Sequence, residues 1–81
     1  MRVLYFAWLR ERIGTSQEIV ETQAQTVAEL VAELRGREAR YALAFADLAA
    51  VRVAVDQELT GFDASIAGAR EVAFFPPMTG G

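Results

Sequence analysis

Two apolar segments near opposite ends of the chain limit the folds open to it. Residues 3–9, which follow Arg2, are all apolar, and so are residues 72–75, which follow Glu71. In both segments the side chains that would point to either face of a strand are therefore apolar. A strand that is apolar on both faces is typical of the covered centre of a sheet. We therefore expect residues 2–9 and 71–75 to form adjacent central strands.

One segment between these strands carries the signature of an amphipathic helix. Thr26 and Glu29 have the spacing of a capping box, in which a hydroxyl and a carboxylate satisfy free N–H groups at the helix start. Gly36 lies where a glycine commonly ends a helix. The apolar stripe between them, which predicts a helix lying on a sheet, consists of Val27, Leu30, Val31 and Leu34.

The remaining segments predict short elements separated by turns. Pro76 and Pro77 end the last strand, because proline has no N–H to donate. The order of strands and helices predicts an α+β fold, a ubiquitin-like β-grasp with a mixed sheet and one main helix packed on one face. The other expected elements are a turn of helix at 10–13, a hairpin connection at 14–16, strands at 17–22, 51–55 and 58–60, a tight connection at 56–57, a short helix within 37–46 and a single turn from Asp63 to Ile66.

Size and composition limit the number of domains, the partners and the compartment that we expect for this chain. The 81 residues make one small domain, which we place at residues 1–77, followed by a flexible tail at 78–81. The net charge of −3 argues against a nucleic-acid partner. The short apolar start has neither a signal-peptide pattern nor a membrane-spanning length, so we expect a cytoplasmic protein without a membrane partner.

The chain contains neither cysteine nor histidine. Thiolate and imidazole metal sites are therefore excluded, and so is a persulfide carried on a side chain. The commonest general base near neutral pH is also absent. Any covalent chemistry must use a hydroxyl, a carboxylate or a chain terminus, and we expect no bound metal or cofactor.

The tail is the most unusual segment. Pro76 and Pro77 favour a stiff, extended exit from the sheet. Gly80 and Gly81 have no Cβ, so they fit a narrow channel and leave the terminal carbonyl carbon unshielded. The five residues from Pro77 onward reach roughly 16 Å when extended, far enough to enter a partner's active site.

The segment from Glu71 to Gly81 resembles the C-terminal signature of the small subunit of molybdopterin synthase. Residues 3–7 with 9–11, and residues 53–57, are also similar to that family, so the resemblance covers essentially the whole chain. The chain departs from the family at Asp56, where Asn is frequent, and at residues 69–70, where Gly-Asp is usual. Both departures concern turn geometry rather than the tail.

The resemblance implies a sulfur carrier. A ubiquitin-activating-type adenylating enzyme would use ATP to convert the Gly81 carboxylate to an acyl-adenylate, which a sulfur donor then turns into a thiocarboxylate. The tail, with Met78, Thr79 and Gly80, would enter the active site of the large subunit of a heterotetrameric synthase and donate sulfur to a cyclic pterin precursor. This chain would then be a non-catalytic, sulfur-donating subunit. The resemblance also implies an exposed patch of Phe6, Leu59 and Phe75 that docks both partners.

Three other functions stay open from the sequence. One is a sulfur carrier of the thiamine type, although such carriers tend to be shorter and lack the Phe-Phe-Pro-Pro exit. Another is a ubiquitin-like modifier joined through Gly81 to lysines of other proteins. The last is a β-grasp interaction module with an inert tail. A separate alternative to the docking patch is that Phe6, Leu59 and Phe75 are all core residues.

Overall fold

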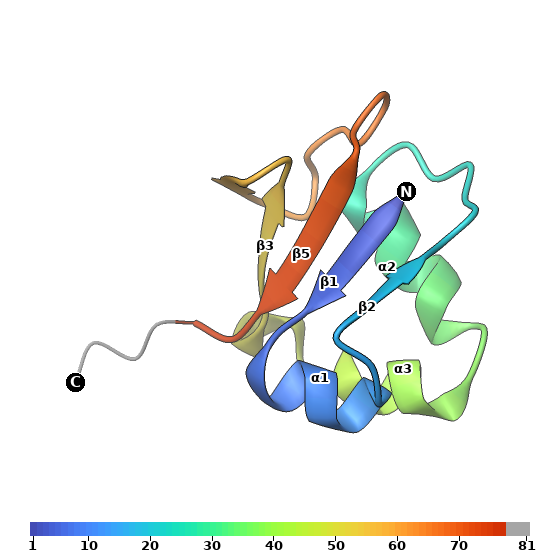
Figure 1. Ribbon diagram of the computed structural model, residues 1–81, viewed down its shortest axis with the longest axis vertical. Coiled ribbons are helices and arrows are strands. Elements are labelled where there is room, and N and C mark those ends of the chain that lie inside the picture. The colour runs from blue at the N-terminus through green and yellow to red at the C-terminus, as the bar shows by residue number, and fades with distance from the viewer. Residues whose placement is uncertain (78–81) are drawn as a thin grey trace.

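The computed structural model describes residues 1–77, in which a mixed five-stranded sheet has the order β2-β1-β5-β3-β4 (Figure 1). The strands are β1 (Arg2–Tyr5), β2 (Gln17–Ile19), β3 (Arg52–Val55), β4 (Glu58–Thr60) and β5 (Glu71–Phe75). The helices are α1 (Ala7–Ile13), α2 (Val27–Arg35), α3 (Ala39–Ala44) and the short 3-10 helix η1 (Leu48–Ala50).

The two apolar end segments are sheet neighbours, as the sequence predicts. β1 and β5 run parallel, with Arg2 opposite Glu71 and Tyr5 opposite Phe74. β5 lies at the centre of the sheet and also pairs antiparallel with β3. Val72 and Phe74 are fully buried on one face of this central strand, and Ala73 between them is also buried, which accounts for its continuously apolar sequence.

The first strand is shorter than expected. It ends at Tyr5, and the predicted continuation to residue 9 is wrong because α1 begins at Ala7. Leu9 and Ile13, four residues apart, are both buried on one face of this helix. α1 ends at Gly14, whose φ of 94° is left-handed and whose N–H bonds to Arg10. A short apolar run is compatible with a strand and with a buried helix. The alternation pattern therefore assigned residues 7–9 to the strand although they belong to α1.

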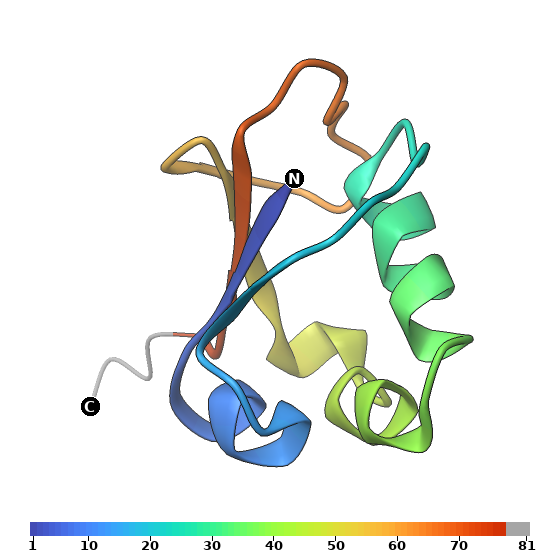
Figure 2. The same ribbon diagram turned by 45° about the vertical axis from the view of Figure 1, so that its right-hand side comes forward.

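The main helix α2 packs on one face of the sheet, as Figure 2 shows. The Thr26 Oγ1 accepts from the Glu29 N–H at 3.2 Å, which confirms the predicted cap. The Glu29 carboxylate reaches the N–H of Gln25, at 3.4 Å, rather than that of Thr26. Gly36 ends the helix with a right-handed backbone conformation, φ −80°, so the left-handed glycine cap that is common at helix ends is not used here. The expected stripe of Val27, Leu30, Val31 and Leu34 is buried.

The second predicted helix is α3, which completes the core. Tyr41 and Phe45 are both buried. The Phe45 ring meets the Phe74 ring edge-on, with centroids 5.0 Å apart, and the Tyr5 ring stacks on Phe74 at 6.3 Å. Among residues 1–77, no helix has the length and apolar character needed to cross a membrane.

The connections differ from expectation in two places. β2 ends at Ile19 instead of residue 22, although the Val20 N–H still bonds to the Met1 carbonyl. The single turn expected from Asp63 to Ile66 lies earlier in the chain, between Gly61 and Ala64. The Ala64 N–H closes it by bonding to Gly61, and the Ile66 N–H then bonds to Gln25 before α2. Ile66 itself is buried.

Candidate functional site

Within residues 1–77, one face of the sheet has no helix packed on it (Figure 2). The register places Leu4 opposite Ala73, Ala73 opposite Ala54, and Ala54 opposite Leu59. Residues that pair directly point to the same face of a sheet. These four apolar side chains therefore form a row across four strands, and we call the face that carries them the open face.

The three residues predicted to form a docking patch lie on or beside this face. Phe75 is two residues after Ala73 on β5 and is partly buried. Leu59, at the far edge, is 72% exposed. Phe6 is 48% exposed and continues β1, because its backbone is extended and its N–H bonds to the Phe74 carbonyl at 3.1 Å. The structure thus brings Phe6 and Phe75 to one end of the sheet, with Leu59 on β4; their role in docking stays a prediction.

Sequence reasoning missed a further apolar residue on the open face. Ile19 of β2 pairs with Arg2 and is 74% exposed. Its neighbours Glu18 and Val20 turn inward, so alternation within β2 was the available signal. The two adjacent apolar residues Ile19 and Val20 concealed that signal in the sequence.

A polar network fixes the start of the central strand. The Arg2 guanidinium donates to the Glu71 carboxylate at 2.6 Å across β1 and β5. Asp56 Oδ1 accepts from the N–H groups of Glu71 and Arg70, at 3.0 and 2.9 Å. These two backbone hydrogen bonds lower the pKa of the Asp56 carboxyl. Asp56 thus ties the β3–β4 connection to β5, and the tight connection predicted at 56–57 is confirmed, with positive φ at both residues.

A second network joins β2 to the helical layer. One carboxylate oxygen of Glu18 accepts from the Tyr5 hydroxyl at 2.7 Å and from the Tyr41 hydroxyl at 2.6 Å. Burial and the hydrogen bond to Glu18 raise the pKa of Tyr41 to about 12. The same two causes raise the pKa of Tyr5. Both phenols are thereby held neutral on the covered side of the sheet, away from the open face.

The predicted tail follows directly from the centre of the sheet. β5 ends at Phe75, and Pro76 and Pro77 are partly buried where the strand stops. Met78, Thr79, Gly80 and Gly81, the predicted tail and attachment residues, lie outside the residues that the structure describes. What the described part establishes is their starting point, beside Phe75 at one end of the open face.

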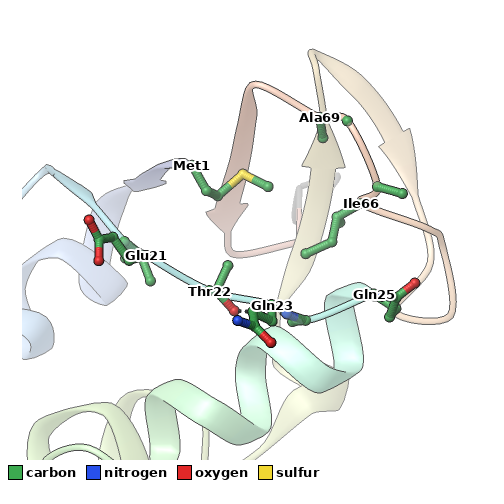
Figure 3. A pocket seen from close by; sticks show the side chains of 11 residues that line it. Met1, Glu21, Thr22, Gln23, Gln25, Ile66 and Ala69 are labelled. Atoms are coloured by element: carbon green, nitrogen blue, oxygen red, sulfur yellow. Dashed lines mark hydrogen bonds between the residues drawn. The ribbon is translucent and has the colours of Figure 1, made fainter.

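A cavity elsewhere on the surface does not adjoin this exit. It has a volume of about 680 Å³ and lies between the segments 20–25 and 66–69. Figure 3 shows Met1 and Ile66 at its wall, with Glu21 and the amide side chains of Gln23 and Gln25 around it. Ala69 places it near the start of β5, whereas the tail leaves from the end. Among residues 1–77, no group of three His, Cys, Asp or Glu side chains is placed to hold a metal ion.

Comparison with known proteins identifies the family. A model described as the ThiS family matches residues 3–81. The chain belongs to the ThiS family. Its similarity to curated members of known name spans both chains from end to end. It is 41% identical to the molybdopterin synthase sulfur carrier subunit of Escherichia coli, covering 100% of this chain and 99% of that protein. The Haemophilus influenzae protein of the same name is 33% identical with the same coverage.

A solved structure confirms the fold of this ThiS-family chain. The small archaeal modifier protein 1 of Haloferax volcanii superposes with a TM-score of 0.74, covering 96% of this chain and 97% of the other. The two sequences are 23% identical, so the likeness concerns the fold. It shows that the predicted ubiquitin-like β-grasp is correct.

Proposed function

We propose that this chain is the sulfur carrier subunit of a molybdopterin synthase, and that its C-terminal Gly81 carries the sulfur as a thiocarboxylate. The observation that carries the proposal is the end-to-end similarity to curated subunits with that function. The absence of cysteine supports the terminal attachment, because no side chain can hold a persulfide. The cytoplasm is the compartment that we propose for this chemistry.

The chemistry begins with activation of a poor electrophile. The Gly81 carboxylate attacks the α-phosphorus of ATP in the active site of a ubiquitin-activating-type enzyme, giving an acyl-adenylate and pyrophosphate. A sulfide-level nucleophile then adds to the acyl carbon, and AMP leaves. The product is a thiocarboxylate whose sulfur is nucleophilic near neutral pH. ATP is consumed by the partner, and this chain needs no cofactor of its own.

Sulfur transfer then takes place in the active site of the large subunit. The thiocarboxylate sulfur forms a C–S bond with an electrophilic carbon of a cyclic pterin precursor, while a C–O bond of that carbon breaks and its electron pair leaves on the oxygen. This step links the carrier to the substrate as a thioester. Water attacks the acyl carbon, the C–S bond on the carrier side breaks, and Gly81 returns as a carboxylate. The carrier supplies the sulfur and its position, while the catalytic side chains belong to the large subunit.

The geometry of the domain suits this delivery. The central strand β5 leads into Pro76 and Pro77, so the tail starts from a strand that is paired on both edges. Phe6 and Phe75 lie at the same end of the open face. A partner that docks there receives a tail of limited length at a fixed position. Met78, Thr79 and Gly80 would then lie inside the partner's channel, where the lack of a Cβ at Gly80 allows close approach.

Intact mass spectrometry tests the proposal directly. We expect co-expression with an activating enzyme to give a mass gain equal to the exchange of one oxygen for sulfur, located on Gly81 by fragmentation. The loaded chain, mixed with the large subunit and the pterin precursor, should return to its original mass as product forms. Loading without any transfer to the pterin would contradict the proposal and point to a thiamine-type carrier. Recovery of Gly81 in isopeptide bonds to lysines would point to a protein modifier.

A further inference from the structure

A second surface, distinct from the open face, lies where α1 and α3 pack side by side (Figure 1). It holds a cavity of about 540 Å³ lined by Arg12, Arg40 and Leu43. Arg12 belongs to the last turn of α1, and the other two residues belong to α3. The cavity therefore combines two guanidinium groups with one aliphatic side chain.

Arg40 is fixed by the fold. One of its terminal nitrogens donates to the Ile13 carbonyl at the end of α1, at 2.6 Å. The other donates to the Glu38 carboxylate at 3.1 Å and to the Tyr41 hydroxyl at 3.3 Å. Arg40 thus joins the two helices, and Glu38 neutralises part of its charge. It forms a rigid wall of the cavity.

Arg12 is held differently and keeps its donors available. Its guanidinium carbon lies 4.5 Å from the centre of the Trp8 ring, one helical turn earlier. This cation–π contact orients the group without consuming its hydrogen-bond donors. Within residues 1–77, Arg12 makes no ion pair. A guanidinium that is pre-oriented and unpaired is suited to two parallel hydrogen bonds with a carboxylate.

Leu43 gives the cavity its apolar part. Its side chain is 67% exposed, although most large aliphatic residues of this domain are buried. Leu43 lies three residues after Arg40, on the same side of α3. The chain as a whole has a net charge of −3, whereas the residues that line this cavity are two arginines and one exposed leucine. Charge complementarity points to an acidic residue followed or preceded by an apolar one.

We propose that this cavity is a second docking site, which takes a carboxylate flanked by an apolar side chain from the large subunit. The site is within reach of a partner on the open face. α1 begins directly after Phe6, and the five steps from Ala7 to Arg12 advance roughly 8 Å along the helix. The proposal rests on the function proposed above, because the large subunit is its partner.

The test is binding of the isolated large subunit to matched charge-reversal variants. Arg12→Glu should weaken affinity about tenfold or more, since a like charge would face the partner's carboxylate. Arg35→Glu makes the same change of charge in the last turn of α2, at an exposed residue, and should stay within about twofold. Leu43→Ser should weaken binding by a smaller factor. Raised salt should narrow the difference between wild type and Arg12→Glu.

Several outcomes would overturn the inference. Equal losses for Arg12→Glu and Arg35→Glu would mean that only net charge matters. Unchanged binding of Arg12→Glu, with a wild-type chain that binds and transfers sulfur, would remove the second site and leave the proposed function standing. A wild-type chain that neither binds the large subunit nor transfers sulfur would overturn both. Thermal melting of each variant checks the fold, and Arg40 is left unchanged because it joins α1 to α3.

Discussion

The two faces of the sheet differ in what their apolar residues do. On the covered face, Phe74 is fully buried between the rings of Tyr5 and Phe45. Its neighbour Phe75 faces the other way and is partly buried, on the face that also carries the exposed Leu59. The fold accounts for the first phenylalanine completely. An apolar row that no element of the domain covers calls for a partner.

Polar groups show the same division. On the covered side, Glu18 accepts hydrogen bonds from two buried tyrosines, which ties β2 to α3 through the core. On the open face, Arg2 pairs with Glu71, but the Arg2 side chain is 52% exposed. Ion pairs of this kind contribute about 0–1 kcal/mol. Stability is therefore concentrated on one face, and substitutions on the other should change binding more than folding.

The largest expected effect concerns Gly81, the proposed attachment residue, rather than either face. Deleting Gly81, or adding a residue after it, should abolish sulfur transfer and leave the melting temperature unchanged. The fold does not depend on it, because the last strand already ends at Phe75. The chemistry does, because a chain without cysteine has no other proposed place to attach the sulfur. A reconstituted assay with activating enzyme, sulfur source, large subunit and pterin precursor measures the effect.

Gly81→Ala should have an intermediate effect on the rate of sulfur transfer. A Cβ beside the reacting carbonyl should slow transfer without preventing it, since a displacement of about 1 Å can cost a hundredfold in rate. Full activity of the chain that lacks Gly81 would remove the carrier hypothesis. The domain would then be an interaction module with an inert tail.

Phe74→Ala tests the covered face. Truncating a buried phenylalanine typically costs about 3–5 kcal/mol. That is a large part of the roughly 5–15 kcal/mol that stabilises a domain. Urea denaturation should show a strongly lowered midpoint with a similar slope. A midpoint close to that of the wild type would mean that the ring cluster around Phe74 contributes little.

Phe75→Ala tests the open face with the adjacent residue. It should weaken binding to the large subunit by about 2 kcal/mol, as truncated interface anchors commonly do. Its urea midpoint should fall much less than that of Phe74→Ala, and titration calorimetry with melts on the same sample separates the two effects. A collapse in stability without a specific loss of binding would make Phe75 a core residue. Ile19 lies on β2, the edge strand opposite β4. A loss of binding in Ile19→Thr would therefore show that the partner's contact extends across the open face to that edge.

The parts of the fold that the sequence predicts are those with local signals. The capped helix, the short helix α3 and the pairing of the first and last strands follow from periodicity and capping residues, and all three are confirmed. Their signals are local or depend on simple apolar alternation. The end of β1 was wrong because residues 7–9 are apolar in every register, so only packing of Leu9 and Ile13 decides for a helix.

The site was less predictable than the fold. The sequence resemblance named Phe6, Leu59 and Phe75, and the structure shows their exposure without testing their role. Ile19 and Leu43 were not found, because an exposed aliphatic residue looks the same in sequence as a buried one. Which side of an element faces the core depends on contacts between distant segments, such as β2 with β1 and α1 with α3.

The smallest expected effect is a pH dependence that belongs to the covered side alone. Free tyrosine phenols titrate near pH 10, whereas the pKa of Tyr41 is raised to about 12 and that of Tyr5 is raised as well. Above pH 10 the unfolded chain therefore loses phenol protons that the folded protein keeps. The free energy of unfolding should be fully retained below pH 10 and fall as the pH rises towards 12, by at most about 1.4 kcal/mol per pH unit for each phenol.

The composition of the chain makes this measurement unusually clean. All eight basic side chains are arginines, so no lysine titrates in the same range. Urea denaturation at intervals between pH 9 and about 11.5 gives the slope, and Tyr41→Phe should reduce it while keeping the ring in the core. Phe75→Ala, on the open face, should leave the slope unchanged. A slope that Tyr41→Phe does not alter would show that the Tyr41 phenol does not couple to folding through its hydrogen bond to Glu18.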